Sequence, residues 1–195
     1  MNSSNFIEYR VEEKLDDQGR LLERKWCPRN SNDIYRQGGP ALETFSPESG
    51  KLLYSVWCEE IGYGVHRNED FPARISIDED SGITYDEEYC RNGMTWRDGD
   101  KPATIARDRK NGAVICLEYF IGGNLHRDYD LPAIMAFDRN TGDLTIAKYY
   151  QYGKLHRENG PAVIEYNDNA EVISSQYYIN GQKVSEPTAA LDLTP

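Results

Sequence analysis

Residues 149 to 162 read YYQYGKLHRENGPA, and the pattern of this segment returns along most of the chain. An arginine marks each copy, and the dipeptide Pro-Ala follows it after four or five residues. The arginines are Arg36, Arg67, Arg97, Arg127 and Arg157, which lie 31, 30, 30 and 30 residues apart. A period of this length indicates tandem structural repeats, each formed by one supersecondary unit.

Two further positions keep the same period. Ten residues after each of the first four Pro-Ala prolines comes a glycine, and an aromatic residue follows seven residues later. The copies are a partial leading copy (6–26), repeats at about 26–56, 57–88, 89–118, 119–148 and 149–176, and a partial last copy (177–183). We therefore predict one repeat domain over residues 1–183. Residues 184–195 lack the pattern, so we expect a flexible tail there.

The residues after each Pro-Ala alternate between apolar and other side chains. Ala133, Met135 and Phe137 would share one face, and this period of two is typical of a β-strand. Clusters of Asp, Asn or Thr with glycine, such as residues 138–142, supply the positive φ that hairpin loops need, and Asn92-Gly93 suits a tight primed turn. The sequence predicts an all-β, elongated tandem array of about six antiparallel β-hairpin repeats of roughly 30 residues, because a single hairpin cannot bury its apolar face.

The unit Tyr-x-Asn-Gly-x-Leu-His-Arg-x-x-Gly-Pro-Ala, best kept over residues 149–162, resembles divergent MORN-type repeats of bacterial, phage and giant-virus proteins. The resemblance covers nearly the whole chain. It implies rows of β-hairpins that contact proteins or lipids, and it links some bacterial members to toxin neutralisation. The period here is longer, and Pro-Ala stands where MORN repeats have glycine-rich segments.

The negative charge of the chain argues against some classes of binding partner. The net charge is −11, and residues 67 to 90 carry eight acidic and two basic side chains. Such a surface repels phosphate, so we expect neither direct nucleic-acid binding nor membrane binding. The sequence has no signal-like N-terminal segment and no apolar run long enough to cross a bilayer, so we expect a cytoplasmic protein with reduced cysteines.

Residue types that could carry chemistry sit at repeat positions. His66, His126 and His156 precede the repeated arginine, where other copies have Tyr35 and Trp96, so we favour packing over a metal site. The five repeated arginines are interpreted as structural forks to carbonyls or carboxylates of adjacent units, with an anion track as the alternative. We expect no enzyme activity, catalytic residue, metal or cofactor.

One region breaks the repeat symmetry, and breaks of this kind often carry function. It contains an acidic stretch and a longer turn over residues 59–65, and a plain solvated acidic face is the alternative interpretation. The predicted partner-binding residues are Trp57, Tyr63, Glu69, Asp70, Asp78, Glu79, Asp80, Tyr85, Asp86, Glu87, Glu88 and Trp96.

These observations favour a non-enzymatic inhibitor or immunity-type protein whose acidic face covers a basic partner, such as a toxin, nuclease or defence protein. The alternative is a structural or adaptor scaffold that bridges partners or self-associates, for example as a homodimer, because open hairpin arrays leave edge strands. A small ligand bound in a groove of the array is a third possibility.

Overall fold

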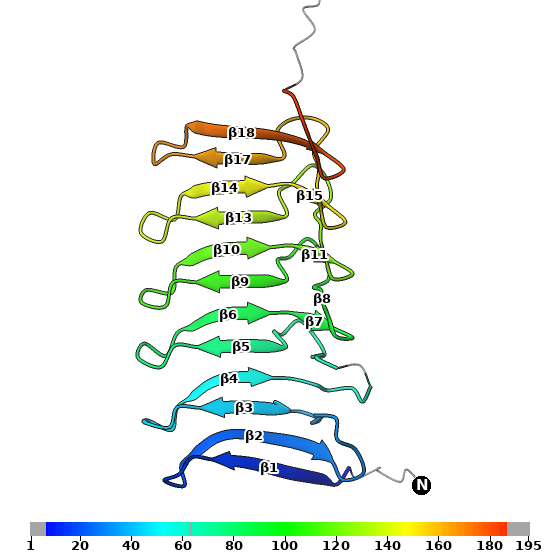
Figure 1. The fold of residues 1–195 in the computed structure, drawn as a ribbon, viewed down its shortest axis with the longest axis vertical. Helices are drawn as coiled ribbons and strands as arrows, with labels where there is room; N and C mark the ends of the chain where they lie inside the picture. The colour runs from blue at the N-terminus through cyan, green and yellow to red at the C-terminus, as the bar shows by residue number, and fades with distance from the viewer. Residues whose placement is uncertain (1–6, 63, 187–195) are drawn as a thin grey trace, which may run out of the picture.

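The fold is an elongated single-layer β-sheet built from hairpins that follow one another in chain order (Figure 1). The computed structural model describes residues 7–62 and 64–186. Thirteen strands form the main sheet, and every neighbouring pair is antiparallel. The predicted all-β array of about six hairpin repeats is confirmed.

Six hairpins contribute the first twelve strands of the sheet, and β19 adds the thirteenth. The main-sheet strands are β1 (Tyr9–Leu15), β2 (Leu21–Pro28), β3 (Leu42–Phe45), β4 (Leu52–Val56), β5 (Arg74–Ile77), β6 (Thr84–Glu88), β9 (Thr104–Arg107), β10 (Val114–Glu118), β13 (Ile134–Phe137), β14 (Leu144–Lys148), β17 (Val163–Tyr166), β18 (Val172–Ile179) and β19 (Gln182–Val184). The strands of the three short hairpins are β7 (Cys90–Arg91), β8 (Met94–Thr95), β11 (Phe120–Ile121), β12 (Asn124–Leu125), β15 (Tyr150–Gln151) and β16 (Lys154–Leu155).

Each long hairpin closes through a loop that its own first residue organises. In the loop after β13, Asp138 Oδ1 accepts hydrogen bonds from the amides of Asn140 (2.8 Å) and Thr141 (2.9 Å). Gly142 then adopts a φ of +79°, which glycine reaches without steric cost. We call the row of such loops, at residues 46–51, 78–83, 108–113, 138–143 and 167–171, the loop edge of the sheet.

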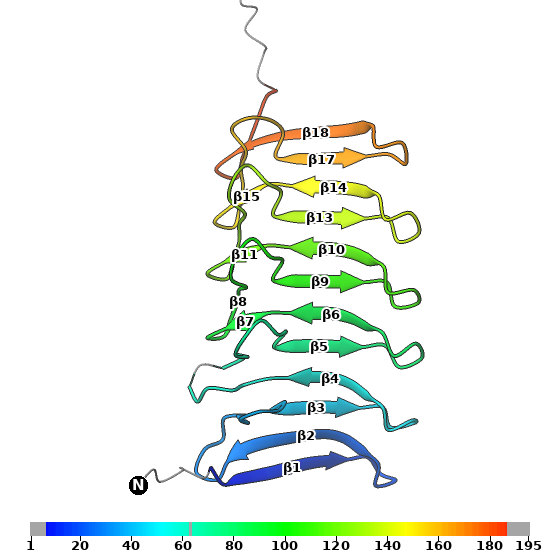
Figure 2. The same cartoon turned by 180° about the vertical axis from the view of Figure 1, so that it is seen from behind.

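The opposite side of the sheet carries the short hairpins, as both ribbon views show (Figures 1 and 2). The two central turn residues have positive φ in each of them, for example Asn92 (+51°) and Gly93 (+75°). This geometry matches a type I′ turn, as Asn92-Gly93 predicts. We call residues 57–62, 64–72, 89–102, 119–132, 149–161 and 177–184 the turn edge.

The core is thin because the sheet is one layer. The alanine of every Pro-Ala is fully buried, at Ala41, Ala73, Ala103, Ala133 and Ala162. One hydrophobic cluster joins Ala41, Val56 and Cys58 to partly buried neighbours that include Tyr54. Stability therefore depends on contacts between adjacent repeats.

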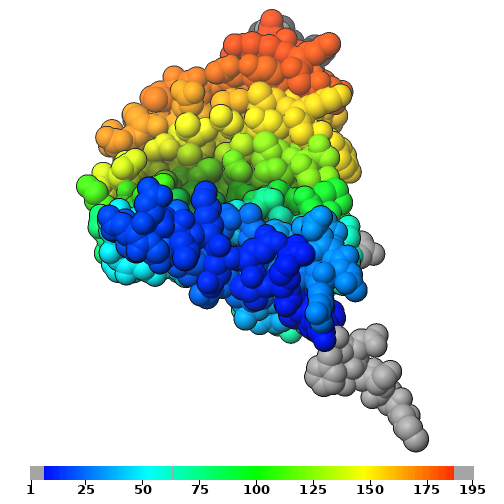
Figure 3. Space-filling view, turned by 60° about the horizontal axis from the view of Figure 1, so that its bottom comes forward, coloured from blue at the N-terminus to red at the C-terminus, as the bar shows by residue number. Residues whose placement is uncertain are grey.

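Two predicted boundaries differ from the structure. Val184 belongs to β19 and pairs with Tyr177, so the predicted tail does not begin there; residues 187–195 lie outside the described chain. The first hairpin extends to Pro28, two residues beyond the predicted leading copy. Its strands are longer than those of the middle repeats and close one end of the array, where the N-terminal band lies in the space-filling view (Figure 3).

Candidate protein-binding surface

The repeated arginines lie at the turn edge and connect its parts. Each guanidinium stacks on the recurrent aromatic ring of its own repeat, and Nη1 donates to the carbonyl of the Pro-Ala proline. For Arg127, the guanidinium carbon is 3.8 Å from the centre of the Tyr119 ring and Nη1 is 3.4 Å from the Pro132 oxygen.

Three of these arginines also reach into the preceding repeat. Arg97, Arg127 and Arg157 bind the carboxylates of Asp70, Asp100 and Asp130 with two hydrogen bonds each, at 2.6 to 3.1 Å. In each pair the aspartate lies 27 residues before the arginine. Each bidentate Arg–Asp pair therefore connects one repeat to the next. These bonds use most of the guanidinium donors that an anion would need, which argues against the anion track.

These ion pairs lower the pKa values of the aspartates. Hydrogen bonds from Arg97 and Lys101 hold the pKa of Asp70 far below its usual range, and the bond from Arg127 lowers the pKa of Asp100. Both carboxylates are therefore ionised throughout the neutral range. Asp70, a predicted partner-binding residue, is engaged within the array.

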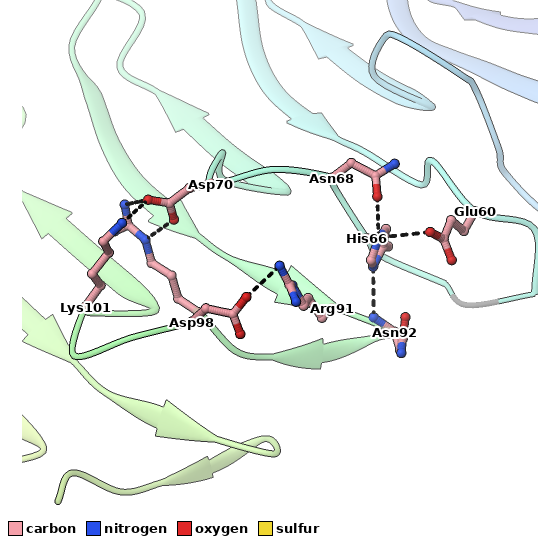
Figure 4. Close-up of polar contacts among 9 residues, drawn as sticks. Glu60, His66, Asn68, Asp70, Arg91, Asn92, Asp98 and Lys101 are labelled. Carbon is pink, nitrogen blue, oxygen red and sulfur yellow. Dashed lines mark hydrogen bonds and ion pairs between the residues drawn. The ribbon is translucent and has the colours of Figure 1, made fainter.

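The histidines form a second connection between repeats. Nδ1 of His66 accepts the amide of Asn92 at 3.2 Å, and His126 and His156 accept the amides of Tyr152 and Asn180 in the same way. All three rings are buried. Figure 4 shows His66 between the turn residue Asn92 on one side and Asn68 and Glu60 on the other. An accepting Nδ1 fixes the neutral tautomer with its proton on Nε2.

Trp96 replaces histidine in one repeat, and the surface is hollowed there. A turn-edge cavity of about 370 Å³ is lined by Trp96, Arg97, His126, Arg127 and Tyr129 among others. Cavities of about 240 and 180 Å³ lie at the corresponding places in the repeats before and after it.

Exposed apolar side chains gather on the same edge. Nine of the thirteen large apolar side chains that are exposed in the described chain lie there, and the other four lie on the end strands β1 and β18. The nine are Ile61, Phe71, Met94, Ile121, Tyr129, Leu131, Tyr152, Ile179 and Val184. Contiguous exposed apolar surface is typical of protein interaction sites.

The predicted acidic face is divided by the structure. Asp86 and Glu88 lie on one face of β6 and Glu87 on the other, because successive side chains of a strand alternate. Glu69 and Asp70 lie on the turn edge, whereas Asp78, Glu79 and Asp80 lie on the loop edge. The eight acids therefore share no single surface.

Several of these acids hold the array together. Asp78 Oδ1 accepts from the amide and hydroxyl of Ser81 within its own loop. Glu79 accepts from the hydroxyls of Ser46 (2.6 Å) and Ser49 (2.8 Å) in the preceding loop. One carboxylate oxygen of each residue is thus already hydrogen-bonded.

On the strand, Glu88 accepts from Thr95 and pairs with Arg74. Burial would raise the pKa of Glu88, but these two partners hold it below its usual value. Its neighbour Asp86 has a raised pKa because of burial and the nearby carboxylates of Glu88 and Glu118.

The predicted aromatic anchors also differ in how accessible their rings are. Trp57 is covered by the Arg67 guanidinium at 4.1 Å and Tyr85 by that of Arg109 at 3.8 Å, so neither ring face is fully free. Trp96 lines two turn-edge cavities. Tyr63 lies outside the described residues.

The cysteines are all free thiols. Burial raises the pKa of Cys58 to about 11 and that of Cys90 to about 12, so both are protonated and unreactive at neutral pH. Within residues 7–62 and 64–186 no group of three or more histidine, cysteine or acidic side chains is arranged to hold a metal ion. The same part of the chain contains no helix that could span a bilayer.

Sequence reasoning assigned no binding role to Tyr129, and it interpreted Asp98, Asp128 and Glu158 only as acids near the repeated arginines. Tyr129 is 88% exposed at a φ of +61°, in a position where another copy has Gly99 (+73°). Asp98, Asp128 and Glu158 each follow the repeated arginine, and their side chains are 59%, 62% and 77% exposed. Comparing the copies position by position would have found both signals, because a tyrosine at a glycine position departs from the repeat.

No family model, curated protein or solved structure matches this chain, so the MORN-type resemblance stays a prediction that rests on the repeated residues alone.

Proposed function

We propose that this protein is a non-enzymatic binding protein that covers a basic surface of a partner protein, as an inhibitor or immunity protein does. The observation that carries the proposal is the turn edge, which exposes both large apolar side chains and the carboxylates of Asp98, Asp128 and Glu158. Exposed aromatic and aliphatic anchors supply binding energy, and surrounding charge selects and steers the partner.

The charge of the whole chain supports the same class of partner. A net charge of −11 favours encounter with a basic toxin, nuclease or defence protein and disfavours nucleic acid. The binding surface that we propose differs from the acidic stretch at residues 67–90, since several carboxylates of that stretch are already bound within the array.

Site-specific photocrosslinking in the native cells tests the proposal. A photoreactive phenylalanine derivative at position 129 should crosslink to one basic protein, and the same group at Asp168 on the loop edge should not. Binding of the purified partner should weaken as salt is raised. Equal crosslinking from both positions, or an acidic partner, would contradict the proposal.

A self-associating scaffold is the second candidate, and the end strand β18 favours it. Val172 and Ile173 are 56% and 64% exposed, and the outer side of residues 172–176 pairs with no strand in the described chain. Such an edge can template pairing with another chain. Sedimentation of the pure protein beside Ile173→Lys would detect this, since the lysine should abolish any dimer.

A further inference from the structure

Three of the turn-edge cavities occupy equivalent places in successive repeats. The cavities of about 240, 370 and 180 Å³ each lie between the arginine loop of one repeat and that of the next. The first two share Trp96 and Asp98, and the second and third share Arg127. The three cavities therefore follow one another from repeat to repeat, and we call them the row.

The spacing of this row follows from the sheet. Each repeat adds two strands, and neighbouring strands lie about 4.7 to 4.9 Å apart, so equivalent points recur about every 9.4 to 9.8 Å. A polyproline II helix has three residues per turn and a rise of about 3.1 Å, so its side chains recur on one side about every 9.3 Å. An extended β-strand repeats on one side about every 6.6 to 6.8 Å and does not match.

The walls of the cavities also suit such a ligand. Phe71 and Trp96 line the first cavity, and Trp96 and Tyr129 line the second. The Arg67 guanidinium lies 4.8 Å from the centre of the Phe71 ring. Polyproline II segments bind in aromatic-lined grooves. No guanidinium of the described chain stacks on the Trp96 or Tyr129 ring, unlike the rings of Tyr119 and Tyr149. These two rings are therefore free to contact a ligand.

The exposed carboxylates of the turn edge recur with the same spacing. Asp98, Asp128 and Glu158 occupy one position of three successive repeats and line the same cavities. Their partners within the chain leave them largely exposed, at 59%, 62% and 77%. One carboxylate per repeat faces one side chain per turn of the ligand, so lysine or arginine at every third residue would meet each of them.

Because the spacing of the row matches that of a polyproline II helix, we propose that the turn edge binds a proline-rich segment of a partner protein. The segment adopts the polyproline II conformation and has a basic residue at every third position. This inference rests on the proposed function, because it takes the partner to be basic, and it adds the conformation and residue period of the segment that is bound.

Fluorescence anisotropy with labelled twelve-residue peptides tests the period and the conformation. We expect (Pro-Pro-Lys)₄ to bind to the full chain at least about tenfold more tightly than a peptide of the same composition in which the lysines are irregularly spaced. The peptide (Gly-Gly-Lys)₄ keeps charge and spacing but lacks the polyproline II preference, and it should also bind at least about tenfold more weakly.

Protein variants locate the site. Asp98→Asn/Asp128→Asn/Glu158→Gln should weaken binding of (Pro-Pro-Lys)₄ at least about tenfold. The matched control Asp80→Asn/Asp143→Asn/Asp168→Asn removes the same charge from exposed side chains of the loop edge and should change it less than about twofold. Tyr129→Gly removes a ring at a backbone position that suits glycine, so it tests the groove while preserving the fold.

The outcomes separate this inference from the proposed function. Equal binding of the proline, glycine and irregular peptides would overturn the polyproline II assignment but leave a basic partner in place. Equal binding of (Pro-Pro-Ser)₄ would contradict the basic partner itself. Absence of binding by every peptide, or an equal effect of the two triple variants, would overturn the inference, while photocrosslinking still decides the function.

Discussion

One backbone position of the repeat favours glycine, yet one copy has an exposed tyrosine there. The second residue after the repeated arginine has a φ of +74° at Gly38, +60° at Glu69, +73° at Gly99 and +61° at Tyr129. Residues other than glycine are rare in this region because the Cβ atom crowds the backbone. Tyr129 adopts this strained conformation although its side chain is 88% exposed. Packing of the ring therefore does not explain why tyrosine is present there.

Tyr129→Gly should therefore leave folding intact and raise the free energy of unfolding by about 0.5 to 1 kcal/mol, as relief of strain exceeds the added chain entropy. Gly99→Ala should lower it by about 1 kcal/mol; a Cβ there meets nothing within 4 Å, so only the backbone conformation opposes it. Urea denaturation measures both. A large destabilisation by Tyr129→Gly would show that the ring supports the fold.

Two aspartates should respond to pH in opposite directions. The pKa of Asp86 is raised by burial and by Glu88 and Glu118, so its ionisation opposes folding as pH rises above the unfolded value of about 3.9. Asp86→Asn should raise the melting temperature at pH 7, and the gain should vanish below about pH 4.

Asp100 provides the opposite case. Its pKa is lowered by Arg127, so its stabilisation is present above about pH 4 and is lost as pH falls through the folded value. Asp100→Asn should lower the melting temperature at pH 7, and that loss should shrink in acid. Parallel pH profiles for the two variants would contradict both assignments.

At the scale of elements, the turn edge depends on links between hairpins. The imidazole of one repeat holds the primed turn of the next, and the amide of the following glycine donates to the earlier strand, as in Gly181 to the Leu155 carbonyl at 2.8 Å. Repeat periodicity predicted that these histidines pack in the structure. It did not predict their acceptor, because a turn 24 to 26 residues away becomes a neighbour only when hairpins stack.

His156→Phe should keep the packing but leave the Asn180 amide without its acceptor, at a cost of about 1 kcal/mol. Amide hydrogen exchange at Asn180 and Gly181 should speed up about fivefold. The reverse change, Trp96→His, should slow exchange at Gly122, whose amide has no acceptor within the described residues. Unchanged exchange at Asn180 would show that the ring contributes only packing.

The whole molecule is a one-dimensional stack in which each repeat contacts mainly its neighbours. Hairpins follow one another along the long axis, and strand order equals chain order apart from the short hairpins (Figure 1). Such an array can lose a complete unit without loss of register, because the remaining interfaces are equivalent.

Deletion of residues 119–148, one complete repeat, should give a folded protein that is shorter by about 9.4 to 9.8 Å and less stable. Deletion of 119–147 leaves one extra residue, which shifts strand alternation and places apolar side chains on the wrong face. Circular dichroism, thermal unfolding and small-angle scattering compare the two. Equal stability of both deletions would contradict the register argument.

The sequence by itself determined the all-β class, the hairpin repeat and its turns, because an alternation of period two, loops that end in glycine and a 30-residue period are local or recurrent signals. Only the tertiary structure decided where charge and apolar surface gather. The acids of residues 67–90 look contiguous along the chain, but strand alternation and hairpin stacking send them to two faces and two edges. Asp98, Asp128 and Glu158 lie 30 residues apart in the chain, and stacking at the strand spacing places their carboxylates on one row, with Tyr129 next to Asp128.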